Sequence, residues 1–297
     1  MSVDARSVQS EGRQARVLTL SMIIFGTIGI CRRYIPLPSE VLSFGRGILG
    51  GVFLLLVLRV RGQRFCPDRI RKKDAVMLAL TGALIGFNWI LLFEAYNFTT
   101  VAVATLCYYM QPVIVMALSP VVLKEKLSAK QVFCIAVSVV GMTLVSGVVG
   151  GSGAAAGAGS LKGILLGLGA AVLYASVVLL NKTVEGVPAY EKTIIQLFSA
   201  AAVMIPYMAC TGTLRTYSMP AVGVILFLTV GILHTGICYT MYFGAIEALP
   251  ARTCALLSYI DPVSAVVLSA VLLREPMNRW GILGTVLIIG SAIYSQL

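Results

Sequence analysis

Hydrophobic residues form long uninterrupted runs in this chain of 297 residues, and charged residues fall mostly in the short stretches between the runs. The hydrocarbon core of a bilayer is about 30 Å thick, so an α-helix needs about 20 apolar residues to cross it. Runs of about this length recur along the whole chain, at residues 17–35, 41–58, 75–96, 101–123, 131–149, 161–181, 189–210, 220–245, 251–273 and 280–296. The pattern predicts an all-α integral membrane protein with ten transmembrane helices.

Composition agrees with this interpretation and excludes several other classes of protein. Hydrophobic residues make up 58% of the chain and charged residues 12%, whereas about a quarter of the residues in a soluble domain are charged. A soluble globular enzyme, a disordered chain and a coiled coil are therefore excluded. The seven cysteines are scattered, with no CxxC pair and no metal-ligand spacing, so we expect neither a metal nor a cofactor.

The connection between the fifth and sixth runs differs from the others. Residues 147–159 are almost entirely glycine and alanine, which is typical of a flexible linker. It leaves five runs on each side. We therefore divide the chain into a cytoplasmic tail (1–16), a first five-helix repeat (17–149), a Gly/Ala linker (150–160) and a second five-helix repeat (161–297).

The net charge of +11 records orientation in the membrane, because Lys and Arg concentrate in cytoplasmic loops. If the N-terminus is cytoplasmic, the inner segments carry 16 basic residues: Arg6, Arg13, Arg16, Arg59, Arg61, Arg64, Arg69, Arg71, Lys72, Lys73, Lys124, Lys126, Lys130, Lys182, Lys192 and Arg252. The outer segments then carry 6: Arg32, Arg33, Lys162, Arg215, Arg274 and Arg279. This bias predicts a multi-pass protein of the plasma (inner) membrane with both termini in the cytoplasm and no nucleic-acid partner.

The two halves of the chain resemble each other at an offset of 150 residues. Residues 106–125 (LCYYMQPVIVMALSPVVLKE) and 256–275 (LLSYIDPVSAVVLSAVLLRE) are identical at nine of twenty positions, including Tyr109/Tyr259 and Pro112/Pro262. A unit of five helices crosses the membrane an odd number of times, so a second copy enters upside down. The repeat therefore predicts the inverted architecture of many secondary transporters.

The ten spans, the repeat and the two segments 109–127 and 259–277 resemble the EamA-type branch of the drug/metabolite transporter superfamily. Each segment has a proline in mid-helix and, near its end, Leu followed by a basic residue and Glu. The resemblance covers nearly the whole chain. It implies a transporter of small organic molecules, with a substrate cavity at the interface of the two repeats formed mainly by helices 1, 3, 4, 6, 8 and 9. The substrates of this family are diverse, so the resemblance leaves the substrate open.

Asp261 is the most informative single residue. It lies near the middle of the run 251–273, where an ionisable side chain is costly and is usually functional. Pro262 follows it, so the ninth helix should kink or break there. Asp261 then either takes part in binding or proton coupling, or serves as the N-cap of a new helical segment. The first repeat has Gln111 before Pro112, so only the second can take up a proton at this position.

Two further residues are candidates for proton coupling, each with a structural alternative. His234, the only histidine, lies near the centre of the run 220–245. Imidazole changes charge near neutral pH, which suits a proton relay, but a neutral histidine bonded to a neighbouring helix is the alternative. Glu94 lies about one turn from the outer end of the third run, from which it could reach either the cavity or water.

Basic and aromatic side chains complete the predicted binding site. Arg46 lies about 8 Å inside its helix at 1.5 Å per residue, so it needs a partner or a water-filled cavity. Arg32 lies at the end of a short first run. It either takes part in the binding site or contacts lipid phosphates. Tyrosine and tryptophan can line a cavity with a flat apolar wall. The full set of predicted binding residues is Arg32, Arg46, Trp89, Glu94, Tyr109, Gln111, Tyr174, His234, Tyr239, Tyr259 and Asp261, with Pro112 and Pro262 as hinges.

Together these features favour a secondary transporter that moves a small organic metabolite, amino-acid-like or related, by alternating access. Proton coupling is a hypothesis, and the alternatives are an uncoupled facilitator or a multidrug exporter of the same fold. The nucleotide-binding motif GxxxxGK[ST] does not occur. A membrane-embedded enzyme is a weaker alternative, because HExxH, GxSxG and a facing pair of aspartates are not found in the sequence. We expect a monomer or homodimer in the lipid bilayer.

Overall fold

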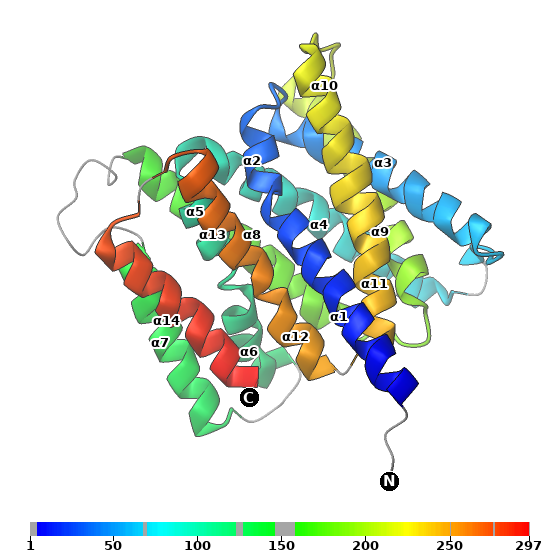
Figure 1. Ribbon diagram of the computed structural model, residues 1–297. Coiled ribbons are helices and arrows are strands. Elements are labelled where there is room, and N and C mark those ends of the chain that lie inside the picture. The colour runs from blue at the N-terminus through cyan, green and yellow to red at the C-terminus, as the bar shows by residue number, and fades with distance from the viewer. Residues whose placement is uncertain are drawn as a thin grey trace.

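The computed structural model describes residues 5–67, 70–122, 127–145, 158–249, 251–275 and 277–296. Across these residues the secondary structure is helical, with no strand (Figure 1). The first half contains α1 (Ala5–Gly26), α2 (Ile28–Arg33), α3 (Ser39–Val60), α4 (Lys72–Phe98), α5 (Val101–Tyr108), α6 (Gln111–Val122) and α7 (Ala129–Val145). The second contains α8 (Ala158–Asn181), α9 (Ala189–Thr211), α10 (Ala221–Leu228), the π-helical segment η2 (Thr229–Ile237), α11 (Cys238–Ala248), α12 (Ala251–Ser258), α13 (Ile260–Leu272) and α14 (Arg279–Gln296).

The expected all-α membrane architecture is confirmed. Among the described residues, seven helices are long and apolar enough to cross a bilayer, and three shorter apolar helices accompany them. They coincide with the ten predicted spans. The one large difference is at the start, where α1 begins at Ala5, so part of the predicted tail 1–16 continues the first helix. Its residues include good helix formers such as Gln, Arg and Glu and no proline, which explains the extension. Residues 146–157, with most of the predicted linker, lie outside the described part of the chain.

The fourth and ninth spans are both broken, at equivalent positions of the repeat. The break separates α5 from α6 at Tyr109 and Met110, and α12 from α13 at Tyr259. Each break lies about three residues before a proline, and the two prolines, Pro112 and Pro262, occupy equivalent positions of the repeat. A proline lacks the N–H that would bond the carbonyl four residues earlier and its ring collides with that carbonyl, so the helix must reorganise there.

The predicted N-cap role of Asp261 is corrected by this geometry. The residue that caps α13 is Tyr259, which makes no capping hydrogen bond with its side chain, and Asp261 is the second residue of the helix. The backbone N–H of Tyr259 bonds the carbonyl of Leu256 at 3.3 Å, so the turn tightens before the proline and the new helix begins early. The carboxyl group of Asp261 is thereby free to point toward another element.

Spans one and eight are also irregular, although neither has a proline at its irregular point. The first is interrupted at Thr27, between α1 and α2, and the eighth passes through η2. The hydroxyl of Thr27 lies 2.8 Å from Nε2 of His234, so the two irregular points are in contact. Short π-helical segments inside α-helices are frequent at functional sites.

The two halves pack closely against each other. Helices α3 and α4 of the first half contact α8 and α9 of the second, and α1 lies along α11 and α13. Gly82 on α4 allows a close approach of α9, since an added β-carbon would lie 2.6 Å from the carbonyl oxygen of Gln196. At one edge α7 pairs with α14, where the hydroxyls of Ser138 and Ser291 lie 2.7 Å apart. Two repeats of five spans, inverted relative to each other, thus share one interface.

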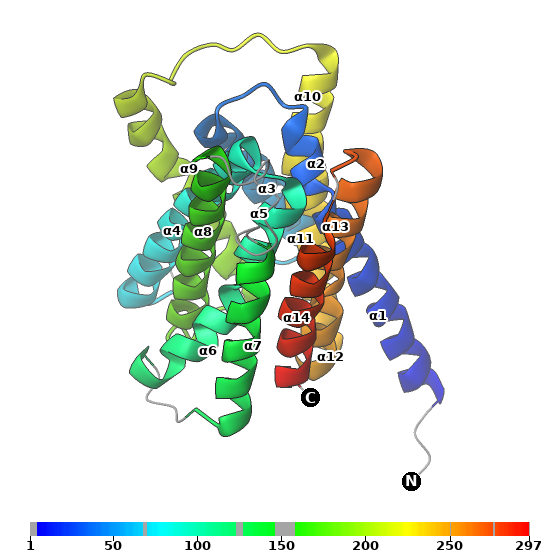
Figure 2. The same cartoon turned by 90° about the vertical axis from the view of Figure 1, so that its left-hand side faces the viewer.

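Two ends of the bundle can be distinguished. The start of α1 and the end of α14 lie at one end, which we call the terminal end, while α2 and the start of α10 lie at the opposite, far end (Figures 1 and 2). Because successive spans cross in opposite directions, the loop between α3 and α4 also lies at the terminal end. The other segments that were predicted to be inner lie at the same end.

Candidate functional site

A cavity of about 470 Å³ lies between the two repeats. Its wall combines α1, α3, α4 and the α5–α6 break from the first repeat with α8, α9, α11 and the α12–α13 break from the second. Small-molecule sites commonly have this size and a mainly apolar wall with a few polar groups. The polar and aromatic candidates that line it are Arg46, Trp89, Tyr109, Gln111, Tyr174, Tyr239 and Asp261.

Arg46 on α3 is a basic group in the wall of the cavity. Its guanidinium carbon lies 4.2 Å from the centre of the Trp89 ring, and its Nε donates a hydrogen bond of 2.7 Å to the hydroxyl of Thr235. Only 5% of Arg46 is exposed. Among the described residues no carboxylate is within ion-pair distance of it. A buried guanidinium held by stacking and by a single neutral hydrogen bond is well suited to bind an anionic group of a ligand.

Asp261 faces Tyr109 across the interface of the repeats. The Tyr109 hydroxyl donates a short hydrogen bond to Oδ2 of the carboxylate. Tyr109 lies in the break of the fourth span and Asp261 just after the break of the ninth, so this contact links the two broken helices. Both residues line the cavity.

Aromatic rings form much of the remaining wall. On one side Tyr108 lies 5.7 Å, centre to centre, from both Tyr109 and Tyr174. On the other side a second row runs through Phe25, Tyr239, Phe243 and Tyr242, each ring 5.7–5.9 Å from the next. Such rings offer an apolar surface to the organic part of a ligand, and their hydroxyls can orient it.

Polar residues of α8 and α9 line the terminal end of the cavity, and sequence reasoning did not include them in the site. They are Asn181, Lys192, Thr193 and Gln196. The amide of Gln196 donates to Oδ1 of Asn181 and to the hydroxyl of Thr81, both at 2.8 Å. Lys192 was assigned to an inner loop by its charge, although it belongs to the first turns of α9. The signal that could have identified Gln196 is an amide within a long apolar run.

Four of the predicted binding residues lie outside the lining of this cavity. Arg32 donates to the carbonyl of Ile35 at 3.0 Å and to the Ser39 hydroxyl at 3.2 Å, and Ser39 in turn donates to Glu94 at 2.8 Å. Arg32 and Glu94 thus belong to one polar cluster near the far end. Tyr259 is 8% exposed and packs in a hydrophobic cluster with Met110.

His234 is fully buried, and both of its ring nitrogens have partners. Nε2 lies 2.8 Å from the Thr27 hydroxyl and Nδ1 lies 3.2 Å from the carbonyl of Thr229. The Thr229 carbonyl can only accept, so Nδ1 donates to it, and Nε2 then shares the single hydroxyl hydrogen of Thr27 with the carbonyl of Ile24, which lies 2.7 Å from that hydroxyl. This arrangement fits the structural alternative, in which His234 joins η2 to the α1–α2 break.

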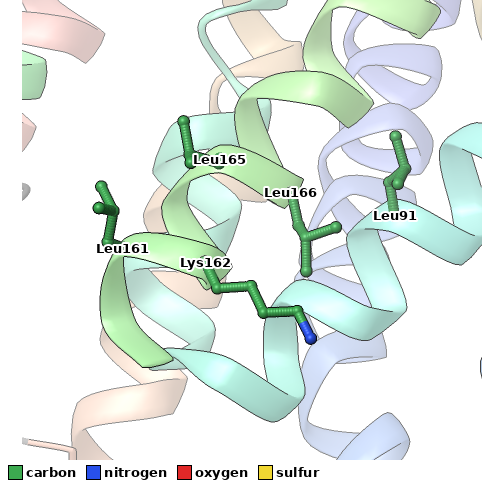
Figure 3. Close-up of a pocket in the computed structure, with 5 residues that line it drawn as sticks. All are labelled: Leu91, Leu161, Lys162, Leu165 and Leu166. Carbon is green, nitrogen blue, oxygen red and sulfur yellow. The ribbon is translucent and has the colours of Figure 1, made fainter. Parts of the chain in front are cut away.

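A second hollow lies on the outer surface of the bundle, between α4 and α8 (Figure 3). Leu161, Leu165 and Leu166 from α8 and Leu91 from α4 line it, and the Lys162 side chain extends across it toward α4. The ammonium group of Lys162 lies 3.8 Å from the centre of the Phe98 ring. The apolar lining is typical of a lipid-facing surface. In the described part of the chain no group of three His, Cys, Asp or Glu side chains could hold a metal ion.

Comparison with known proteins gives a consistent result. The pattern of the EamA-like transporter family matches residues 16–147 and again residues 161–295, one match for each repeat. The chain is 30% identical to the uncharacterized transporter YxxF of Bacillus subtilis, over 95% of this chain and 89% of that protein. It is 22% identical to the uncharacterized inner membrane transporter YicL of Salmonella typhimurium, over 94% of this chain and 93% of that protein. A crystal structure shares the fold with a TM-score of 0.66 and 18% identity, over 96% of this chain and 97% of the other.

Proposed function

The chain belongs to the EamA-like transporter family, and from this premise we propose that it is a secondary transporter that carries a small organic metabolite, amino-acid-like or related, by alternating access. The observation that supports the proposal most strongly is the cavity of about 470 Å³ between the inverted repeats, with Arg46 and Asp261 in its wall. Transport sites of inverted-repeat carriers lie at this interface, near discontinuous helices.

The chemistry of the wall suggests the kind of substrate. Arg46 offers a planar, permanently charged donor to a carboxylate or a similar anion. The tyrosines around Tyr174 and Tyr239 offer apolar surface for the carbon skeleton. Asp261, when ionised, can accept hydrogen bonds from an ammonium group, so a small zwitterion would satisfy both charges at once.

We propose that transport is coupled to protons through Asp261, and its contact with Tyr109 supports this proposal. In the ionised state the carboxylate accepts the Tyr109 hydroxyl, which ties the two broken helices together. Protonation removes the negative charge and weakens this charge-assisted hydrogen bond, so the breaks at spans four and nine can separate. A proton and a substrate ammonium group would then compete for one carboxylate, which is the basis of exchange.

We propose that a solute enters the cavity from its polar end. The lining extends from Arg46 and Asp261 to Lys192 in the first turns of α9, at the terminal end of the bundle. The charge bias of the loops predicts that this end faces the cytoplasm. We therefore propose that this conformation is open toward the cytoplasm and closed at the far end.

Substrate identity can be tested by thermal-shift screening of the purified protein against a metabolite library at two pH values. A ligand of this cavity should stabilise the wild type and stabilise Asp261→Asn and Arg46→Gln less. Glu185→Gln is the control, because Glu185 lies in the exposed loop between α8 and α9. Counterflow of the labelled hit in proteoliposomes, with recovery of unchanged compound, distinguishes transport from catalysis. Equal stabilisation of all variants would refute this site.

A further inference from the structure

A cluster of polar residues joins the two repeats at the far end of the bundle. Arg33, the last residue of α2, donates through Nη2 to Oε1 of Glu275 at 2.9 Å and to the carbonyl of Thr99 at 2.8 Å. Arg33 and Thr99 belong to the first repeat, and Glu275 follows α13 in the second. We call this group, with Val101 and Ser269, the clasp.

Glu275 holds the clasp together with both of its oxygens. While Oε1 pairs with Arg33, Oε2 accepts a hydrogen bond of 2.9 Å from the backbone N–H of Val101, at the start of α5. The hydroxyl of Ser269 on α13 donates to the same oxygen. One carboxylate therefore connects the end of α2, the start of α5 and the end of α13.

The backbone beside Glu275 is held in an unusual conformation. Arg274 has a φ of +53°, and it is the one residue other than glycine with a positive φ in the described part of the chain. This left-handed geometry turns the chain back after α13 and directs Glu275 onto Ser269 and α5. Such conformations cost free energy in residues other than glycine and are concentrated in clamps and switch regions.

The charges of the clasp are accessible enough to separate. The side chains of Arg33 and Glu275 are 31% and 15% exposed, so water can replace each partner when the pair opens. A partly exposed ion pair adds little net stability, which makes it suitable for a contact that forms and breaks repeatedly. A fully buried pair would leave two desolvated charges behind on opening.

We propose that the Arg33–Glu275 pair is the far-end gate of the transporter, and that a solute reaches the cavity from that end only when the pair separates. The proposal rests on the alternating-access function above. It assigns Arg33 and Glu275 as positioning residues, which set access and do not touch the substrate in the cavity. Arg32 and Glu94 lie in the adjacent polar cluster near the same end and bond through Ser39.

The test measures access to the cavity without any substrate. A single reporter cysteine replaces Val178, which lines the cavity on α8, and the native cysteines are changed to serine. A membrane-impermeant maleimide is added only on the far-end side, and the labelling rate is compared between variants. Arg33→Gln and Glu275→Gln should each raise this rate by up to about fivefold. The double variant should label no faster than the faster single variant, because both changes open the same contact.

Matched variants separate gating from general damage. Arg215→Gln removes a charge from the loop between α9 and α10 and should leave the labelling rate unchanged. Arg33→Lys keeps the charge and should restore slow labelling. If Glu275→Gln fails to fold, Arg33→Gln still gives the answer, since its side chain is the more exposed. An unchanged rate in folded Arg33→Gln, or multiplied effects in the double variant, would overturn the gate. Because labelling needs no substrate, this result stands apart from failure of the proposed transport activity.

Discussion

Tyr109 of the first repeat donates a hydrogen bond to Asp261 of the second, and the equivalent contact in the opposite direction is not made. The repeat places Tyr259 at the position of Tyr109, and Gln111 at the position of Asp261. Tyr259 is instead buried in a hydrophobic cluster with Met110 and Val113. The breaks of the two helices are thus joined by the Tyr109–Asp261 contact, so protonation of this carboxyl group can act on both breaks.

This asymmetry predicts different outcomes for two otherwise matched substitutions. Tyr109→Phe removes a donor to a charged acceptor, a loss of about 1.5–3 kcal/mol, so pH-driven transport should fall by about tenfold or more. Tyr259→Phe should retain most of the activity. Initial rates of labelled-substrate uptake in proteoliposomes measure both. Equal loss in the two variants would mean that the Tyr109–Asp261 contact has no special role.

Arg46 should contribute to substrate affinity through its geometry as well as its charge. Arg46→Gln should weaken binding about tenfold or more, and Arg46→Lys should recover only part of it, because lysine cannot reproduce the planar donor stacked on Trp89. Calorimetric titration of the screened ligand gives the dissociation constants. Arg59→Gln, at the exposed end of α3, is the charge-matched control. Wild-type affinity in Arg46→Gln would place the anion site elsewhere.

The orientation can be tested with two native cysteines on opposite sides of the bundle. Cys66 lies in the α3–α4 loop and Cys210 is exposed near the end of α9. In intact cells an impermeant maleimide should label Cys210 and leave Cys66 unlabelled until the membrane is permeabilised. Cys66→Ser and Cys210→Ser identify each signal. The reverse pattern would place the termini outside.

The paired prolines should control the rate of the conformational change. Pro112→Ala and Pro262→Ala let the fourth and ninth spans approach continuous helices, because the missing N–H is restored. Each should lower the maximal transport rate several-fold while ligand affinity changes little. Pro206→Ala, in the interior of α9, is the control for loss of a helix proline. Unchanged rates in both variants would argue against hinges at these positions.

Helix positions and the two breaks were predictable from the sequence because each depends on local chemistry. Apolar runs specify the spans, and Pro112 and Pro262 specify where spans four and nine reorganise. The π-helical segment η2 was not predicted, since no proline marks it. It packs on α3 through Gly231 and Gly236, where added β-carbons would collide with Leu49 and Phe53.

Membership of the cavity was only partly predictable. A polar residue in an apolar run is expected to face the protein interior, and Arg46 and Asp261 do so. The pattern does not reveal which polar residues face each other. Arg32 and Glu94 are bridged by Ser39, an ordinary serine in the sequence. Lys192 was not assigned to the cavity, because a basic residue at the cytoplasmic end of a span is also expected from the positive charge of cytoplasmic loops.

The most direct test of the central claim is uptake of the labelled substrate into proteoliposomes under an imposed pH gradient. The account predicts that the gradient drives accumulation in the wild type, and that Asp261→Asn loses this response while still exchanging substrate across the membrane. Glu185→Gln should behave as the wild type. Accumulation that ignores the gradient, together with full activity of Asp261→Asn, would contradict proton coupling at Asp261.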